Sequence, residues 1–331
     1  MTPEPAAGIL AELIGLGGAG LAVTEFERGG AATAVGAGAG VVQIGVHRGG
    51  AVPGGALEAF DILLSTDPAA PGPWVGVPAG QMDATLAELA AAVAAQPVAA
   101  AVAAQVLRAS LQVSFDQALV AESLAYSMLL GAAGFQAWRA ATPVRARVDD
   151  GPRVLIAEAR GGLEIRLNRP SARNAFDARM RDELAEALAF AAEHPDAPPV
   201  VLTGAGPAFS AGGDLDEFGR AGDPGQAHLI RTLRAPARLV RALGARLTAQ
   251  LHGACVGAGI EVPAAAARVT ARPGAVFRLP EVSMGLLPGA GGTATIPRRI
   301  GRRRACYMAI SGADIDLRTA LVWGLVDAVA Q

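Results

Sequence analysis

The chain has 331 residues, of which 52% are hydrophobic, and its 28 basic and 30 acidic residues give a formal net charge of -2. This length and apolar content predict one large or two modest globular domains with an ample core. Every basic residue is an arginine, and these are scattered except between Arg298 and Arg304, so no basic face for nucleic acid stands out. We interpret that cluster as a solvated helix start, with a site for a ligand's phosphates as the alternative.

Nothing near the N-terminus predicts secretion or a cofactor site. The start lacks the basic region of a signal peptide, and residues 29–46, although apolar, are mostly glycine and alanine and would insert weakly into a membrane. Cys255 and Cys306 lie in apolar surroundings without metal-ligand spacing, which indicates packed thiols in a reducing compartment. The stretch GLGGAG, residues 15–20, fits a dinucleotide motif, but no acid follows about 20 residues later, which favours a glycine-rich surface segment. We expect a soluble, cytoplasmic protein.

The pattern predicts three helices before a polar linker. The expected helices cover residues 83–95, 97–109 and 114–141. Thr85 with Glu88, and Ser114 with Gln117, have the spacing of capping boxes. The last helix is long and amphipathic, with one acid, Glu122, near its middle. The polar residues 141–153 that follow, with a proline near each end, predict the linker between two regions, 1–145 and 146–331.

After the linker, strand and helix patterns alternate. Residues 162–167 have period-two apolar spacing, and residues 199–204 form a short apolar run, so both predict strands. Between them, residues 177–193 predict a helix. The second strand leads into a glycine-rich turn, at the end of a strand where open α/β folds usually bind ligands.

Five motifs then carry a family resemblance. LNRPSARNAFD, AFSAGGDLDEF, HGACVGAGIEV, RLPEVSMGLLPGAGGT and GLVDAV occur in this order. Together they resemble the crotonase, or enoyl-CoA hydratase/isomerase, superfamily over roughly residues 153–329. The resemblance implies an α/β fold built as a spiral of ββα units, which binds an acyl-CoA thioester and holds its enolate in an oxyanion hole.

The same resemblance assigns roles to individual residues. Backbone N–H groups of Ala211 and Ala258 would form the oxyanion hole, although the family more often has glycine at the second position. Side chains would block a thioester from such N–H groups, which explains the small residues around Glu261. A helix beginning near Gly257 to Ile260, with Pro263 in its first turn, would add its dipole to the second N–H.

Glu261 and Glu281 fall where hydratases of the family carry their catalytic acids. Glu261 would activate the water that attacks C3 of a trans-2-enoyl thioester, and Glu281 would deliver a proton to C2. From the residues alone, either could instead be a solvated surface acid.

The remaining implied contacts are with the substrate. The predicted substrate-binding residues are Ser171, Ala172, Arg173, Ala175, Gly212, Gly213, Asp214, Gly257, Gly259, Pro288 and Gly289. For Asp214 we favour a helix cap over a place in the CoA cleft. His252 is expected to be a hydrogen-bonded packing residue.

The chain order differs from the family. Its members continue past GLVD with helices that cover the active site and build a trimer, whereas this chain stops at Gln331. Residues 83–141 resemble that tail, and VVQIGVHRGG and FDILLSTDPA loosely echo LEIRLNRPSA and PVVLTGAGPA. We therefore expect region 1–145 to be a degenerate half-copy of the fold with its tail, and region 146–331 to be the crotonase core. An unrelated helical N-terminal domain is the alternative.

The predicted function is hydration of an enoyl-CoA. The alternatives are isomerisation, or dehydration, hydrolysis, decarboxylation or cofactor-free oxygenation of a thioester in a biosynthetic pathway, and a noncatalytic acyl-thioester-binding subunit. No metal or cofactor is expected beyond the coenzyme A of the substrate, and no nucleic acid or membrane partner. We expect a homotrimer or dimer of trimers that buries Leu119, Leu124, Met128 and Phe135 between subunits.

Overall fold

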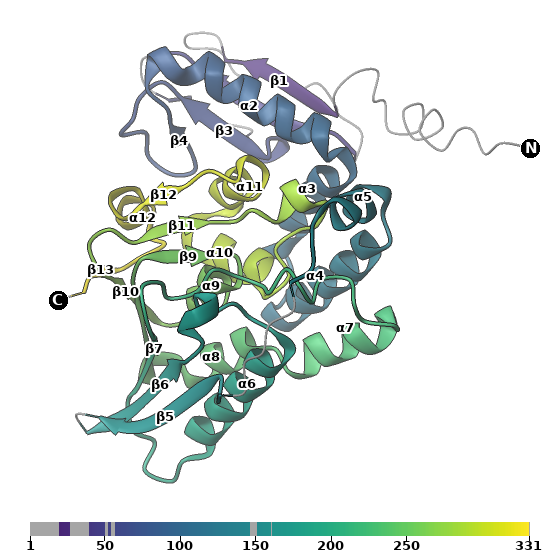
Figure 1. Cartoon of the computed structure of the whole chain (residues 1–331). Coiled ribbons are helices and arrows are strands. Elements are labelled where there is room, and N and C mark those ends of the chain that lie inside the picture. Colours follow the sequence, from purple (N-terminus) through teal and green to yellow (C-terminus); the bar gives the residue numbers. More distant parts are fainter. Residues whose placement is uncertain are drawn as a thin grey trace, which may run out of the picture.

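The computed structural model describes residues 20–26, 40–49, 52–53, 57–145, 151–159 and 161–330. Figure 1 shows the N-terminal strands and α2 as one layer above the rest of the chain. The strands are β1 (Leu21–Glu25), β2 (Val42–His47), β3 (Ile62–Ser65), β4 (Val75–Gly76), β5 (Val154–Ala159), β6 (Gly162–Leu167), β7 (Val200–Gly204), β8 (Leu247–Leu251), β9 (Ala254–Val256), β10 (Arg268–Ala271), β11 (Val276–Arg278), β12 (Ile315–Asp316) and β13 (Ala328–Val329). The α-helices are α2 (Met82–Ala95), α3 (Pro97–Ser110), α4 (Phe115–Leu130), α5 (Ala133–Ala141), α6 (Ala178–Glu193), α7 (Pro224–Leu233), α8 (Pro236–Leu243), α9 (Ala258–Glu261), α10 (Gly292–Ile300), α11 (Arg302–Ser311) and α12 (Leu317–Trp323).

The largest sheet has the strand order β13-β10-β8-β7-β6-β5 and is parallel except for β5, which runs antiparallel to β6. Its β6 and β7 confirm the strands predicted at 162–167 and 199–204. Leu163, Ile165 and Leu167 are buried in alternation, because successive side chains of a strand point to opposite faces. The predicted helix 177–193 is α6, whose first turn is capped by Asp177 through a 2.7 Å bond from the N–H of Met180.

A smaller sheet, β12-β11-β9, holds the turn that follows β7. Ser210 in that turn forms an isolated parallel bridge with Cys255 of β9, and the N–H of Val256 donates to the Ser210 carbonyl at 3.0 Å. The turn after β7 and the segment leading into α9 therefore lie side by side.

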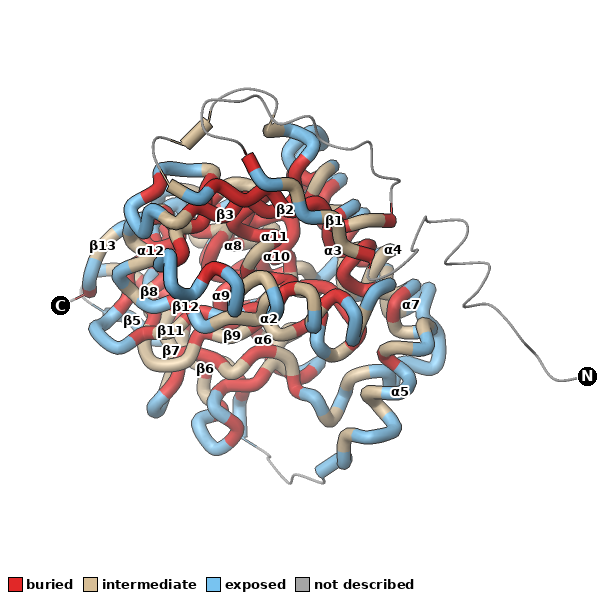
Figure 2. The backbone as a smooth tube through the Cα atoms, turned by 90° about the horizontal axis from the view of Figure 1, so that it is seen from above, coloured by how far each residue is buried: buried red, intermediate tan, exposed pale blue. Residues whose placement is uncertain are grey.

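The N-terminal region shares the core of the rest of the chain. Its sheet, β1-β2-β3-β4, is parallel, and β2 and β3 are buried throughout, as the red tube in Figure 2 shows. Ile44 and Ile62 of this sheet belong to the same hydrophobic cluster as Ile165 and Leu202 of the large sheet. The parallel pairing of β2 with β3 matches that of β6 with β7, as the sequence echo suggested. Descent of region 1–145 from a half-copy stays a prediction.

Helices α2 to α5 correct two details of the sequence analysis. A 3₁₀ turn (Ala79–Gln81) leads directly into α2 at Met82, so the predicted Thr85–Glu88 capping box does not form. The Ser114–Gln117 capping box is confirmed at the start of α4. The long helix predicted to reach residue 141 is two helices, because α4 ends at Gly131 and α5 begins at Ala133.

Three arginines of the cluster, Arg302, Arg303 and Arg304, donate to backbone carbonyls of the N-terminal region. Arg303 donates to the Leu57 carbonyl at 2.6 Å, and Arg304 donates to the Trp74 carbonyl at 2.9 Å. Arg302 donates to the Phe60 carbonyl at 3.0 Å. The solvated interpretation is therefore wrong for Arg303 and Arg304, which are buried and attach α11 to the N-terminal region, and the phosphate site stays a prediction.

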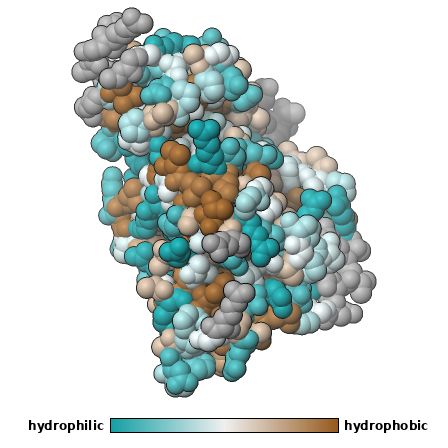
Figure 3. All heavy atoms as spheres, turned by 90° about the vertical axis from the view of Figure 1, so that its left-hand side faces the viewer, coloured by the Kyte–Doolittle hydropathy of each residue, from teal (hydrophilic) through white to brown (hydrophobic). Residues whose placement is uncertain are grey.

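The surface expected between subunits is only partly exposed. Leu119 and Phe135 are buried within the chain, whereas Leu124 and Met128 are 54% and 57% exposed. A second apolar group lies on the face of β13 and α12, where Figure 3 shows brown atoms and where Val322 is 67% exposed. The oligomeric state stays a prediction.

Two expectations concern residues at the N-terminus. Residues 15–19 of the GLGGAG stretch and residues 29–39 of the apolar segment lie outside the described residues, while residues 42–46 form part of β2. Across the described ranges, no single helix is long and apolar enough to cross a membrane, and two bent helix pairs meet the criterion by length and composition only.

Candidate active site

The segment from β8 to α9 brings Glu261 into the interior through two glycines with positive φ angles. Gly253 and Gly257 have φ values of 56° and 49°, which side-chain-bearing residues rarely adopt. A Cβ at Gly253 would lie 2.2 Å from the Pro207 carbonyl oxygen, and a Cβ at Gly257 would lie 2.3 Å from Oε1 of Glu281. Glycine is therefore required twice for the backbone to pass this point.

Helix α9 begins at Ala258, within the predicted range, but it is a single turn. A 3₁₀ turn, Pro263–Ala265, follows it, so Pro263 starts a second short segment and not the first turn of a long helix. The helix dipole at Ala258 is consequently smaller than the sequence analysis assumed.

Glu261 is a buried carboxyl held by the backbone. Its side chain is 2% exposed, and Oε2 accepts hydrogen bonds from the N–H groups of Ala290 at 2.7 Å and Gly292 at 2.9 Å. Burial raises the pKa of Glu261 to about 7, and the two hydrogen bonds oppose that rise. The solvated-acid alternative is excluded for this residue.

The carboxyl group of Glu281 lies beside Gly257, as does that of Glu261. Glu281 begins a 3₁₀ turn (Glu281–Met284) and is 7% exposed. Oε1 of Glu281 and Oε1 of Glu261 both approach the missing Cβ of Gly257, at 2.3 and 3.6 Å from its ideal position. Within the described chain, Oε2 of Glu281 is buried without a hydrogen-bond partner. Burial, together with the charge of Glu261, raises the pKa of Glu281 well above its ordinary value, so Glu261 ionises more readily.

A third buried carboxyl comes from the N-terminal region. Glu122 of α4 accepts hydrogen bonds from the Gly291 N–H at 2.6 Å, the Thr293 N–H at 2.8 Å and the Thr293 hydroxyl at 2.7 Å. Burial, and then the charge of Glu261, raises the pKa of Glu122 to about 8. Glu122 and Glu261 thus bind alternate N–H groups of the same short segment, residues 290–293.

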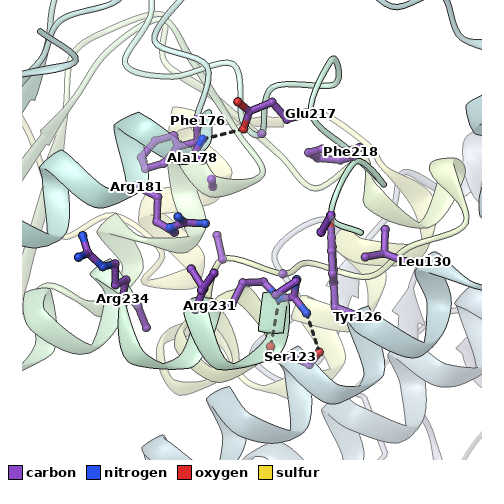
Figure 4. Close-up of a pocket in the computed structure, with 18 of the residues that line it drawn as sticks. Ser123, Tyr126, Leu130, Phe176, Ala178, Arg181, Glu217, Phe218, Arg231 and Arg234 are labelled. Atoms are coloured by element: carbon purple, nitrogen blue, oxygen red, sulfur yellow. Dashed lines mark hydrogen bonds between the residues drawn. The ribbon is translucent and has the colours of Figure 1, made fainter. Parts of the chain in front are cut away.

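The three carboxyl groups line one cavity of about 610 Å³. Figure 4 shows this cavity, with Ser123 and Tyr126 of α4 on one side and Phe176 and Ala178 on another. Among the predicted site residues, the cavity is lined by Gly213, Asp214, Ala258, Glu261, Glu281 and Gly289. Of the helices predicted to pack near Glu261, α4 lines this cavity, and the origin of these helices as a relocated tail stays a prediction.

A second cavity of about 530 Å³ adjoins the first. Its lining includes the predicted residues Ser171, Ala172, Arg173, Ala175 and Ala211. Gly213 and Asp214 line both cavities, so the two share a wall. The structure thus places seven of the eleven predicted substrate-binding residues around two adjoining cavities.

The geometry does not support Ala211 as an oxyanion-hole donor. Its N–H donates to the Arg173 carbonyl at 2.9 Å and is not available to a ligand. The N–H groups of Gly213 and Ala258, in contrast, make no hydrogen bond with any described residue. The turn and α9 are in close contact here, since a Cβ at Gly212 would lie 2.9 Å from the Val256 carbonyl oxygen. Gly213 is the better candidate for the first donor.

Four predicted site residues, Gly212, Gly257, Gly259 and Pro288, line neither cavity. They serve close packing, as at Gly259, where a Cβ would lie 2.6 Å from the Ser210 carbonyl oxygen. Asp214 does not cap a helix; it accepts a 2.6 Å bond from Nη1 of Arg169. His252 is hydrogen-bonded to the Gly206 carbonyl at 2.9 Å, as expected of a packing residue.

Comparisons with known proteins agree with this fold and site. The enoyl-CoA hydratase/isomerase family matches residues 158–331, and the chain belongs to this family. It is 35% identical over 173 residues to a mevalonyl-coenzyme A hydratase of Beauveria bassiana, a match that covers 50% of this chain and 62% of that protein. It is 34% identical over 181 residues to the 2,3-dehydroadipyl-CoA hydratase of Escherichia coli, covering 53% and 68%. A crystal structure of enoyl-CoA hydratase from Thermoplasma volcanium has a TM-score of 0.50 at 33% identity, covering 54% of this chain and 72% of that one.

Sequence reasoning assigned no role to Glu122 and did not single out Tyr126. The signal for Glu122 was its isolation, because it is an acid near the middle of an otherwise apolar helix face. Tyr126 lies one turn further along that face, and a Cβ at Gly289 would lie 2.4 Å from its ring. The residues of α4 that reach the cavity thus follow the helical period.

Proposed function

We propose that the protein hydrates a trans-2-enoyl-CoA thioester. The observation that carries the proposal is the pair of buried carboxyl groups, Glu261 and Glu281, which approach one point of the cavity beside two N–H groups without hydrogen bonds. The names of the relatives are consistent with this reaction, but they concern proteins that the chain matches only in part.

The two acids differ in a way that suits addition of water. Two N–H groups stabilise Glu261 as a carboxylate, whereas Glu281, whose Oε2 has no hydrogen-bond partner among the described residues, is more easily kept protonated. In the proposed reaction Glu261 takes a proton from water while the water oxygen forms a bond to C3. The π electrons of C2=C3 move toward the thioester and give an enolate, and Glu281 then gives its proton to C2. Proton exchange between the acids restores the starting state.

The enolate oxygen would be held by the N–H groups of Gly213 and Ala258. Preorganised N–H donors in a water-poor cavity stabilise developing negative charge without reorganisation. The second cavity, lined by Ser171, Arg173 and Ala211, would hold the CoA portion of the substrate. The substrate would pass from this cavity into the first one at Gly213, which lines both. The reaction needs no metal or cofactor besides the CoA of the substrate. We further propose that the protein acts in the cytoplasm as a homo-oligomer.

The test compares Glu261→Gln and Glu281→Gln with a control, Glu217→Gln. An amide keeps the shape of the acid but has no useful basicity, so each catalytic variant is expected to lower kcat by roughly 10²-fold or more. Affinity for a saturated acyl-CoA should stay near normal, because backbone N–H groups hold the thioester. Glu217 lines the same cavity but binds only the Ala178 N–H at 2.7 Å, and its variant should keep its activity.

Mass spectrometry of the products decides among the alternatives. A gain of one water supports hydration, and the double variant should be little worse than the worse single variant. Full activity of Glu281→Gln beside an inactive Glu261→Gln would replace the two-acid hydration with a one-acid isomerisation. Binding of acyl-CoA without any change in mass would leave a noncatalytic role.

A further inference from the structure

The cavity carries a concentration of positive charge that the hydration mechanism does not use. Arg181, Arg231 and Arg234 line it, as Figure 4 shows, and Arg220 lines it as well. These arginines come from α6, from α7, and from the chain just before and just after α7. Their surroundings indicate which of them are available to a ligand.

Arg231 makes its side-chain hydrogen bonds, among the described residues, to uncharged groups alone. Its Nε donates to the Ser123 hydroxyl at 3.1 Å, and its Nη2 donates to the Ser123 carbonyl at 3.3 Å and to the Ser127 hydroxyl. The guanidinium also lies 5.0 Å from the centre of the Tyr126 ring. Among the residues that the structure describes, no carboxylate forms an ion pair with it, although it is half-buried.

Two of the other three arginines have acidic partners, whereas Arg220, before α7, forms no ion pair with a described residue. Arg181 pairs with Asp182 at 2.8 Å, and Arg234 pairs with Glu186 at 3.1 Å. Burial lowers the pKa of Arg231, the charges of Tyr126 and Glu122 raise it, and the positive charge of Arg181 lowers it, so the two guanidinium groups are close enough to repel each other. An anion between them would remove that repulsion.

The acids along this part of the cavity have other partners. Asp177 is 2.9 Å from Nε of Arg153, and Asp214 is 2.6 Å from Nη1 of Arg169. The carboxylate of Asp223 caps α7 through the N–H groups of Gly225 and Gln226. Glu217 accepts its bond from Ala178, as noted above. The positive charge of Arg231 is therefore not balanced by these acids.

We propose that the acyl group of the substrate ends in a carboxylate, which Arg231 binds with Arg181 on its other side. This inference rests on the proposed function, because it assumes that the cavity with Glu261 and Glu281 takes the acyl chain. A guanidinium presents several N–H donors in one plane and suits a carboxylate.

Tyr126 places this carboxylate away from the reacting carbons. One edge of its ring packs on Gly289, in the loop that precedes the segment bound by Glu261, and Arg231 lies over its face. The ring thus separates Arg231 from the catalytic acids, and the acyl chain would pass along it. A dicarboxylic acyl thioester, with methylene groups between its two ends, fits this arrangement.

The experiment measures kcat/KM for pairs of trans-2-enoyl-CoA thioesters of equal chain length that end in a carboxylate or in a methyl group. The full-length protein is expected to prefer the carboxylate by about 10-fold or more at one chain length. Arg231→Gln should lower kcat/KM for that substrate by about 10- to 100-fold and leave the methyl-ended partner nearly unchanged. Arg181→Gln should have the same direction with a smaller effect.

Arg234→Gln is the matched control. The Arg234 guanidinium is paired with Glu186 on the outside of α6, so its replacement should not change the preference between the two substrates. Equal losses on both substrates in Arg231→Gln would show that the arginine only joins α7 to α4, and a preference for the methyl-ended substrate would also overturn the proposal. If no thioester is turned over, the proposed function fails. The inference about the carboxylate is then tested by calorimetry, which measures the affinities of the two corresponding saturated acyl-CoA ligands. Equal affinity of the two ligands would refute it, and a preference for the carboxylate that Arg231→Gln abolishes would support it.

Discussion

Replacing Glu122 by glutamine tests whether a buried acid of the N-terminal region is protonated in the folded protein. Its pKa is about 8 in the fold, against an ordinary value of 4.5, because burial and the charge of Glu261 disfavour ionisation. A carboxyl group with a raised pKa binds its proton more tightly when the protein is folded. Its contribution to stability is complete below pH 4.5 and is lost as the pH rises through about 8.

The size of the effect follows from the same values. One pKa unit corresponds to about 1.4 kcal/mol, so the rise at Glu122 is on the order of 5 kcal/mol of unfolding free energy lost by pH 8. Glutamine has no such titration. At pH 5 it should be less stable than the wild type by roughly 1–3 kcal/mol, because its single oxygen can accept from Gly291 or from Thr293, and its NH₂ group leaves the other donor without an acceptor.

The assay is urea unfolding of both proteins at several pH values between 5 and 8.5. The wild type should lose stability more steeply, so the deficit of Glu122→Gln should shrink with rising pH and reverse between about pH 6 and about pH 7.5. Thr293→Val, which removes one donor to Glu122 but keeps the acid, serves as the control and should retain the wild-type slope. A constant difference between Glu122→Gln and the wild type would refute the reasoning and mean that Glu122 is ionised in the fold throughout.

Three further predictions concern the loop, the assembly and the N-terminal region. Gly292→Ala would place a Cβ 2.7 Å from Oε2 of Glu261. We expect kcat to fall at least about 10-fold with little change in acyl-CoA affinity, and an unchanged kcat in steady-state kinetics would contradict this. Leu124→Glu with Met128→Glu should lower the mass measured by light scattering if the exposed side chains lie between subunits, and a wild-type protein that is monomeric at all concentrations would count against assembly. Removal of residues 1–145 should give an insoluble or inactive core, and a soluble, active fragment 146–331 would disprove the dependence.

The strands and helices of the large sheet could be predicted because their sequence periods match their burial. Residues 162–167 alternate in burial along β6, and the helix predicted at 177–193 is α6. Glu261 and Glu281 were identifiable as a pair because the family motifs fix their positions. Local spacing failed at α2, where the preceding 3₁₀ turn, and not a capping side chain, starts the helix.

Contacts between distant segments could not be predicted in this way. Spacing alone cannot show that the Arg173 carbonyl occupies the N–H of Ala211, since this bond depends on how the loop after β6 folds back. The same holds for Arg304, which looked like a solvated residue but donates to a carbonyl 230 positions earlier in the chain. A buried carbonyl needs a donor, and only the fold determines which arginine supplies it.

The segment 290–293 connects the two halves of the chain at the proposed active site. Its successive N–H groups donate alternately to Glu261 and Glu122. Glu261 precedes Gly292 by 31 positions, and Glu122 precedes Gly291 by 169 positions. If α4 moved, Glu122 would leave two buried N–H groups without acceptors, and the segment would lose one of the two anchors that keep it against Glu261. Glu261 would then keep its place in the core but lose the fixed donors that favour its carboxylate form. The N-terminal region therefore contributes to the protonation of Glu261, the proposed catalytic base, as well as to the wall of the cavity.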